Sequence, residues 1–289
     1  MISPKTLLAA LCLAPAIALA QTASVPIDGR LKKIAQTRSI TLAYRTDAMP
    51  MSFEDDGKKP AGYMVDVCRA VVASIERQIG GTPLQLKWLP VTLQTRMTAV
   101  ASGQADMECG ATTATLGRMK EVDFSTLTFV DGTALLIRAS IAGNSLAAMG
   151  GKKIGVIAGT SNERALAEAL KSKLVNAEVV QVKSRDDGLA QLEAGQIDGF
   201  ASDLVLLMGL SGKAKDPKAL ALLGDTLSYE PLAIVLPRGD WALRLAVNTG
   251  LAQFYKSSAL PETFNRWFGA LGRPSPVLEI MFALGRLPE

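Results

Sequence analysis

The sequence predicts an α/β fold in which helices flank mainly parallel sheets. Short apolar runs alternate with segments of helical period, first over residues 40–109 and again over residues 153–201. In addition, 48% of the 289 residues are hydrophobic. A chain of this length and composition can bury substantial cores, and its length indicates about two domains.

The first series of elements begins at residue 40. Its clearest helix has Val65, Cys68, Val72, Ile75 and Ile79 at spacings of three and four, which is typical of an amphipathic helix. The predicted elements of this series are a strand at 40–44, a helix at 62–78, a strand at 84–88, a helix at 92–101 capped by Thr92, and a strand at 105–109.

The remaining elements repeat the pattern without a low-complexity linker between the two series. The predicted strands are 134–137, 153–157, 179–182, 197–201 and 232–236. The predicted helices are 162–170, 187–194, 204–208, 241–254 and 260–268. Strands that alternate with helices in this way are expected to pair in parallel.

The composition excludes several classes of function. The 31 basic and 27 acidic residues give a net charge of +4, which is too small to indicate a nucleic-acid partner. The absence of histidine from the sequence rules out Ser-His-Asp triads and histidine metal ligands. The chain has neither a phosphate loop nor a dinucleotide-binding fingerprint. We therefore expect no metal, no cofactor and no catalytic residue of these kinds.

Residues 1–20 have the features of a cleavable signal peptide. Lys5 precedes an apolar run at 7–19, and the segment closes with a small residue, Ala20. The run is too short to span a bilayer and no later run is longer, so we expect export to the periplasm without insertion into the membrane. Two cysteines, Cys68 and Cys109, would then lie in an oxidising compartment. They form either a disulfide or two buried free thiols.

The loop after the strand at 105–109 contains residues suited to holding a carboxylate. Free backbone groups at Ala111, the hydroxyl of Thr113 and the guanidinium of Arg118 occur within eight positions. Arginine suits this role because its planar donors match the geometry of a carboxylate. The alternative is that Arg118 is a solvated arginine in a turn.

Two later positions also suggest ligand contacts. Thr160 and Ser161 lie between a strand and a helix, where backbone N–H groups attract anions. Asp203 follows the strand at 197–201, at the edge of a parallel sheet where ligands bind, and it could pair with an ammonium group. The alternative for all three residues is ordinary helix capping.

Taken together, these residues resemble the periplasmic polar-amino-acid binding proteins of ABC importers, solute-binding protein family 3, and most of all its glutamate/aspartate-binding members. The similarity extends over residues 40–268. Its markers are Gly62-Tyr63 with Asp66, Ser102-Gly103 with Asp106, Thr113 with Arg118, Asp123-Phe124-Ser125, Gly151-Lys152-Lys153, Gly159-Thr160, Leu192 with Gly195, Asp198 and Asp203, and Trp267-Phe268.

The resemblance implies a type II periplasmic binding protein fold, with two lobes that each contain a mainly parallel sheet flanked by helices. Lobe 1 would comprise residues 25–131 and 236–289, and lobe 2 residues 132–235. Two hinge strands would join the lobes near 131–135 and 229–234. The lobes would close on a ligand and present a closed face to an ABC permease, and we expect the protein to be a monomer.

The resemblance also assigns ligand contacts. It implies that Arg118, Thr113 and Thr160 bind the α-carboxylate of an amino acid. The α-ammonium would be held by the carbonyl of Ala111, with Thr113 and Asp203.

The distal carboxylate of an acidic ligand would be bound by Arg45 and Arg96, which match arginines of the acidic-amino-acid members. Without this match, each is a surface arginine with a packed stem. Arg185 stands where those members have histidine, and Leu93 and Ala111 stand where they have serines. The ligand is therefore expected to be aspartate or glutamate, a longer amino acid with two carboxylates, or another small anion.

A different class of function is possible on the same fold. Some similar proteins are periplasmic dehydratases of cyclic amino acids such as arogenate or prephenate, which need a general acid in the cleft. Glu108 and Glu163 are the candidates for that acid in this sequence. Turnover of such substrates by the purified protein would identify an enzyme.

Overall fold

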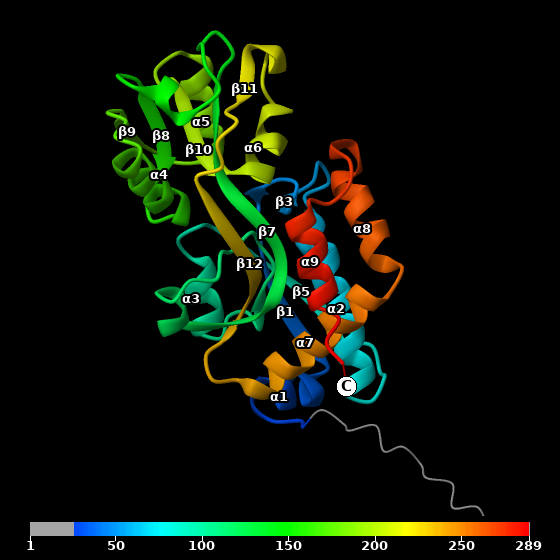
Figure 1. Ribbon diagram of the computed structural model, residues 1–289. Coiled ribbons are helices and arrows are strands. Elements are labelled where there is room, and N and C mark those ends of the chain that lie inside the picture. The colour runs from blue at the N-terminus through cyan, green and yellow to red at the C-terminus, as the bar shows by residue number, and fades with distance from the viewer. Residues whose placement is uncertain (1–25, 289) are drawn as a thin grey trace, which may run out of the picture.

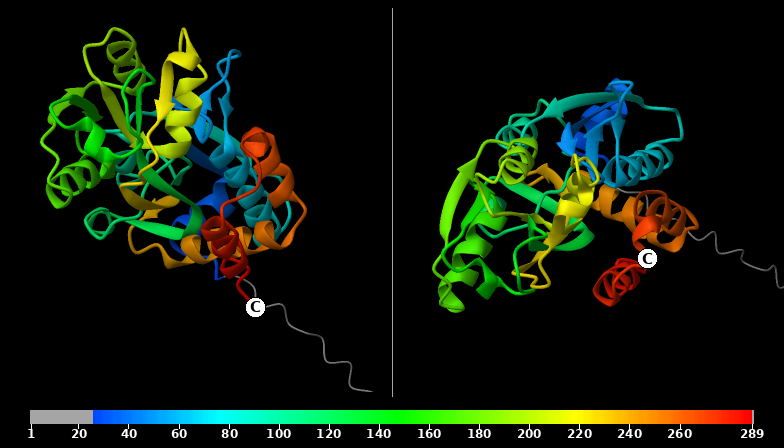
Figure 2. Two further views of the ribbon diagram at one scale, coloured as in Figure 1. Left: turned by 45° about the horizontal axis from the view of Figure 1, so that its top comes forward. Right: turned by 90° about the horizontal axis from the view of Figure 1, so that it is seen from above.

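The computed structural model describes residues 26–288, so the predicted signal peptide lies outside the described part of the chain. Figure 1 shows two lobes, one above the other, joined by two long strands. These strands are β7 (Val122–Arg138) and β12 (Ser228–Pro237). The two views of Figure 2 also show helices on the outside of both lobes.

The first lobe is built around β1, which pairs in parallel with β5 on one side and with β6 on the other. Its main core consists of buried apolar residues from the strands and the surrounding helices. The elements of this lobe are α1 (Gly29–Thr37), β1 (Ser39–Arg45), β2 (Asp47–Ala48), β3 (Ser52–Glu54), β4 (Pro60–Ala61), α2 (Tyr63–Gln78), β5 (Gln85–Val91), α3 (Arg96–Ala101), β6 (Met107–Glu108), α7 (Trp241–Lys256), α8 (Ala259–Phe268) and α9 (Pro276–Leu284).

The second lobe repeats this plan on a smaller scale. Its strands β10, β8 and β9 lie side by side and are parallel to one another. The elements of this lobe are β8 (Lys153–Ile157), α4 (Ser161–Ser172), β9 (Glu178–Val182), α5 (Arg185–Glu193), β10 (Gly199–Asp203), α6 (Leu204–Ser211) and β11 (Leu220–Leu222).

The strands β7 and β12 run antiparallel and place Asp131 directly opposite Glu230. At one end β12 pairs with β6, and at the other end β7 pairs with β10. Within residues 26–288, these pairings join the strands of both lobes into one nine-stranded sheet. The charged pair of residues therefore lies where the chain passes between the lobes.

The fold class predicted from the sequence is confirmed, and most predicted elements occur within a few residues of their expected bounds. Two boundaries were wrong: the strand predicted at 134–137 is the end of β7, which begins at Val122, and the helix predicted at 92–101 begins at Arg96. Thr92 and Thr95 exchange side-chain and backbone hydrogen bonds in a turn before it, and Thr95 takes the N-cap position. The prediction also missed α1, α9, β11 and the small sheet of β2, β3 and β4.

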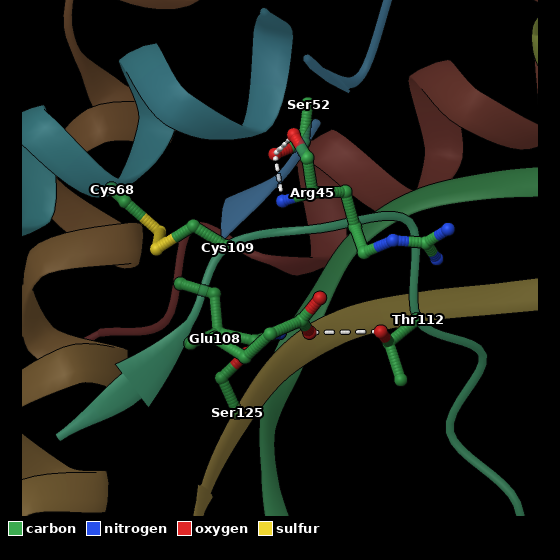
Figure 3. Close-up of a disulfide and its surroundings, with 8 residues drawn as sticks. Arg45, Ser52, Cys68, Glu108, Cys109, Thr112 and Ser125 are labelled. Carbon is green, nitrogen blue, oxygen red and sulfur yellow. Dashed lines mark hydrogen bonds between the residues drawn. A yellow bond between two sulfur atoms is a disulfide. The ribbon is translucent and has the colours of Figure 1, made fainter. Parts of the chain in front are cut away.

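A disulfide joins Cys68 on α2 to Cys109, the residue that follows β6 (Figure 3). Both residues are completely buried, and their Cα atoms are 6.2 Å apart. The bond fixes the start of the loop at 109–118 against the core of lobe 1. In the part of the chain that the structure describes, none of the helices has both the length and the apolar character needed to cross a membrane.

Candidate functional site

The two lobes contact each other directly across the cleft between them. The hydroxyl groups of Thr113 in lobe 1 and Ser161 in lobe 2 are 3.1 Å apart. Leu93 of lobe 1 packs against the apolar cluster of lobe 2. Gly209 on α6 lies so close to lobe 1 that a Cβ atom there would be 2.5 Å from the Met49 carbonyl oxygen. The structure is therefore a closed form.

Four arginines predicted to bind ligand are all buried: Arg45, Arg96, Arg118 and Arg185 are between 2% and 9% exposed. The Nε atoms of Arg45, Arg96 and Arg185 are buried and have no hydrogen-bond partner among the described residues. Burial of guanidinium groups without enough partners is costly, so a site of this kind favours an anion. The alternatives of surface arginines with packed stems for Arg45 and Arg96, and of a solvated arginine for Arg118, are therefore wrong.

Arg96 is held by its own lobe. Its Nη1 donates to the Ala111 carbonyl at 3.1 Å and to the Thr112 hydroxyl at 2.8 Å. The Thr112 hydroxyl in turn donates to Glu108 at 2.8 Å (Figure 3). Burial lowers the pKa of Arg96 to about 9, and the charge of Glu108 opposes this shift. Arg96 is therefore still a cation at neutral pH.

Close packing around Glu108 depends on a glycine. A Cβ atom at Gly110 would be 2.1 Å from Glu108 Oε1 and 3.1 Å from Arg45 Cγ. Any side chain at position 110 would therefore displace both the carboxylate and the stem of Arg45. Glu108 is completely buried and its Oε1 has no hydrogen-bond partner among the described residues.

The loop that carries Thr113 is fixed to the hinge strand β12. Thr113 forms a bridge with Leu232, and the backbone of Ala114 donates to the Pro231 carbonyl. Arg118 Nη1 donates to the Thr113 carbonyl at 2.8 Å, which fixes the guanidinium against this loop. Burial lowers the pKa of Arg118, and Arg164 adds to the effect. Arg118 and Thr113 are thus in direct contact.

On the opposite lobe, Thr160 caps α4. Its hydroxyl accepts from the Glu163 backbone N–H and donates to the Ile157 carbonyl at 2.7 Å. Ser161, the first residue of the helix, places its hydroxyl against Thr113. Thr160 is therefore a helix cap, and the helix that it starts has its positive end at the cleft.

Asp203 stands at the N-cap position of α6 but does not cap the helix. Asp131 on β7 accepts the Val205 backbone N–H instead, at 3.3 Å. Among residues 26–288, the side chain of Asp203 receives only a 3.4 Å hydrogen bond from the side chain of Asn162. The capping alternative is therefore wrong for the side chain of Asp203, which is left available in the closed cleft.

Asp131, Asp203 and Glu230 bring three carboxylates together at the crossing of the lobes. Burial raises the pKa of Asp131 well above its usual value, and the charge of Asp203 adds to this. Burial also raises the pKa of Asp203, but the cation of Arg185 opposes the shift. Because these charges interact, a proton taken up here belongs to the pair of Asp131 and Asp203. Glu230 Oε2 has no hydrogen-bond partner among the described residues.

Sequence reasoning missed three carboxylates that complete this site: Asp47, Asp131 and Glu230. Asp47 forms ion pairs with Arg45 and Arg185, which belong to different lobes. A signal for two of them was present, because Asp131 and Glu230 are charged residues within or beside apolar runs of predicted hinge strands. In the described part of the chain, the side chains of His, Cys, Asp and Glu form no group that could hold a metal ion.

The comparisons with known proteins agree with this architecture. Residues 40–270 match the family model of bacterial extracellular solute-binding proteins, family 3. The glutamate/aspartate import solute-binding protein of Escherichia coli is 30% identical over 265 residues, which cover 92% of this chain and 88% of that protein. The L-glutamate/L-aspartate-binding protein of Pseudomonas aeruginosa is 32% identical over 243 residues, covering 84% and 80%.

Among solved structures, a periplasmic binding protein of an ABC transporter from Brucella ovis, with glutathione bound, has a TM-score of 0.74. The sequences are 22% identical, and the match covers 91% of this chain and 81% of that one. At this level of identity the likeness concerns the fold. The two-lobe arrangement is thus shared with periplasmic binding proteins.

Proposed function

Because the chain belongs to the bacterial extracellular solute-binding proteins of family 3, we propose that it binds an acidic amino acid, glutamate or aspartate, in the periplasm and delivers it to an ABC permease. Two relatives that are 30% and 32% identical are solute-binding proteins named for glutamate and aspartate, which supports this ligand. The same relatives support a non-enzymatic role.

The observation that carries the proposal is the charge arrangement of the closed cleft. One end contains Arg45, Arg96 and Arg185, each with a buried Nε atom that has no hydrogen-bond partner among the described residues. The other end contains the carboxylate of Asp203, which no helix N–H occupies. An acidic amino acid has a carboxylate for the first end and an ammonium group for the second.

The α-carboxylate would lie between these two ends. Arg118 and Thr113 in lobe 1 would bind it, and the start of α4 at Thr160 and Ser161 would reach it from lobe 2. The ligand thus contacts both lobes only when they are closed. Binding would shift the population to the closed form, which the permease then recognises. We propose that the protein acts as a monomer.

A binding screen tests this function. Mature protein would be titrated by isothermal calorimetry with glutamate, aspartate, glutamine, arginine and cystine, and its thermal unfolding would be followed with each ligand. Glutamate or aspartate should bind most tightly and raise the unfolding temperature most. Tighter binding of a neutral or basic amino acid would contradict the proposed ligand, and turnover of prephenate or arogenate would contradict the non-enzymatic role.

The two acids that the enzymatic alternative would use are both engaged in structural hydrogen bonds. Glu108 accepts from Thr112 within the buried chain that leads to Arg96. Glu163 accepts from the Gly159 backbone at 2.8 Å and from Gln181 at 2.6 Å. These contacts support the binding function over a general-acid role for either residue.

A further inference from the structure

Asp47 is the one carboxylate of the site that contacts arginines of both lobes by direct ion pairs among the described residues. Its Oδ1 is 2.6 Å from Arg45 Nη2 in lobe 1, and its Oδ2 is 3.4 Å from Arg185 Nη1 in lobe 2. The two arginine side chains are 2% and 6% exposed, whereas the side chain of Asp47 is 32% exposed. The carboxylate thus reaches inward from the edge of the cleft.

This arrangement is the one expected for a bound ligand carboxylate. Two oxygens face two guanidinium groups that approach from opposite lobes, and Arg45 and Arg185 are close enough for their charges to repel. Asp47 supplies the anion that this pair of cations requires. It also links the lobes in the same way as the proposed ligand would.

Little space remains beside this ion pair. The cavity lined by Asp47, Met49, Arg185, Leu206, Leu210 and Lys213 has a volume of about 10 Å³. A volume of this size accommodates about one water molecule and no ligand carboxylate. A distal carboxylate that bound to Arg45 and Arg185 would therefore have to displace Asp47.

We propose that Asp47 is a specificity-determining residue that competes with the distal carboxylate of the ligand for Arg45 and Arg185. The inference rests on the proposed function, because it assumes that an acidic ligand reaches these arginines. Asp47 weakens the binding of acidic amino acids and has little effect on neutral ones. It thereby reduces the ratio of the affinity for glutamate to the affinity for glutamine.

The partial exposure of Asp47 makes the exchange physically feasible. When the ligand carboxylate replaces it, the Asp47 side chain can turn toward solvent and recover hydration, whereas the buried arginines have no such alternative. Arg45 and Arg185 thus have a carboxylate counter-ion both with and without ligand. The cost of displacement lowers the affinity only for ligands that carry a second carboxylate.

The test is calorimetric titration of the full mature protein and two variants with glutamate and with glutamine. Asp47→Asn removes the charge and keeps the shape of the side chain. Asp56→Asn is the matched control, because Asp56 is an exposed acid in the loop between β3 and β4 of the same small sheet. Asp47→Ser, a second variant without the carboxylate, is used if thermal unfolding shows that Asp47→Asn is not folded.

Asp47→Asn should bind glutamate about tenfold more tightly than the wild type, which corresponds to about 1.4 kcal/mol. Its affinity for glutamine should stay within about twofold, and Asp56→Asn should leave both affinities unchanged. If the wild type binds glutamate and Asp47→Asn binds it equally or more weakly, Asp47 does not compete, and the inference alone is overturned. An equal gain for both ligands would also overturn it. If the wild type binds no acidic amino acid, the proposed function fails and the inference fails with it.

Discussion

The two lobes hold their site residues in different ways. In lobe 1, Arg96 and Arg118 donate to backbone carbonyls of their own lobe, and a disulfide fixes the start of the loop between them. In lobe 2, Ser161 and Arg185 are the first residues of α4 and α5, so the beginnings of helices set their positions. Their described polar contacts across the cleft are with Thr113 and Asp47 of lobe 1.

This difference suggests a division of work during binding. Lobe 1 keeps its guanidinium groups in place through internal hydrogen bonds, so it can bind a ligand before closure with little loss of side-chain entropy. Lobe 2 contributes groups that reach the ligand only after closure. Substitutions in lobe 1 should therefore affect the affinity strongly, and those in lobe 2 should affect mainly the lifetime of the closed complex.

The largest expected effect comes from Arg118→Ala in lobe 1. The variant loses the guanidinium beside Thr113, and we expect affinity for every amino acid to fall about a hundredfold or more, because a charge-assisted hydrogen bond in a dry site is lost. Calorimetric titration with glutamate and glutamine measures the change. Arg164→Ala is the control, since it removes an exposed arginine from α4 and should change either affinity by no more than about twofold. Equal effects of the two substitutions would contradict the role of Arg118.

Arg96→Met should have a smaller and selective effect. It removes the cation that faces the distal carboxylate but keeps a packed apolar stem, so glutamate affinity should fall about tenfold to a hundredfold and glutamine affinity should change little. The substitution also leaves Glu108 without the cation that it reaches through Thr112, so thermal stability should fall. The double variant Arg96→Met with Glu108→Gln should recover stability without recovering glutamate binding. Similar losses for both ligands would contradict selectivity at Arg96.

The sequence predicted the parts of this protein that depend on local pattern. The helix at Tyr63–Gln78 and the strand at Lys153–Ile157 were expected within one residue, because periodic apolar residues determine both. The helix at Pro276–Leu284 was missed. Its buried residues, Leu278, Met281 and Phe282, pack on a core assembled from distant segments, which local pattern does not reveal.

The parts of the candidate site that lie in sequence motifs were predictable. The parts that depend on contacts between residues far apart in the sequence were not. Arg118, Thr160 and Asp203 could be proposed from residue type, position along the chain and the resemblance to family 3. The exchange in which Asp131 caps α6 and leaves Asp203 available depends on contacts between residues 74 positions apart. Such contacts follow from the sheet register, which one sequence does not specify.

The acidic end of the site gives a pH-dependent prediction of intermediate size. The pKa of Asp203 is raised above its ordinary value of 3.8, so the closed protein without ligand retains a proton on the Asp131 and Asp203 pair at a pH where exposed carboxyls are ionised. An ammonium group requires ionised Asp203, so binding releases this proton, and affinity should fall as the pH is lowered through the raised pKa. Between pH 7 and pH 5 we expect a loss of about three- to tenfold for aspartate, whose own carboxyls stay largely ionised.

The raised pKa has the opposite effect on the folding stability of the protein without ligand, which is higher at low pH. Because the folded-state pKa is raised, the stabilising contribution of these carboxyls is fully present below pH 3.8 and is lost as the pH rises through the folded-state value.

The proton released on ligand binding can be measured by calorimetric titrations in buffers of different ionisation enthalpy. Asp203→Asn should bind more weakly at pH 7 and have a flatter dependence on pH. An unchanged slope in that variant would show that another group takes up the proton.

The smallest expected effect is that of Ser161→Ala in lobe 2, and it separates the roles of the two lobes most directly. The substitution removes the 3.1 Å contact with Thr113 and leaves the Thr160 cap of α4 intact. One neutral hydrogen bond contributes about 0.5–1.5 kcal/mol, so affinity should fall about two- to tenfold, at the low end if water replaces the hydroxyl. Because this contact forms only on closure, stopped-flow measurements should show faster dissociation with an unchanged association rate. A slower association rate would mean that lobe 2 already contacts the ligand in the first encounter, and the division of work between the lobes would then be wrong.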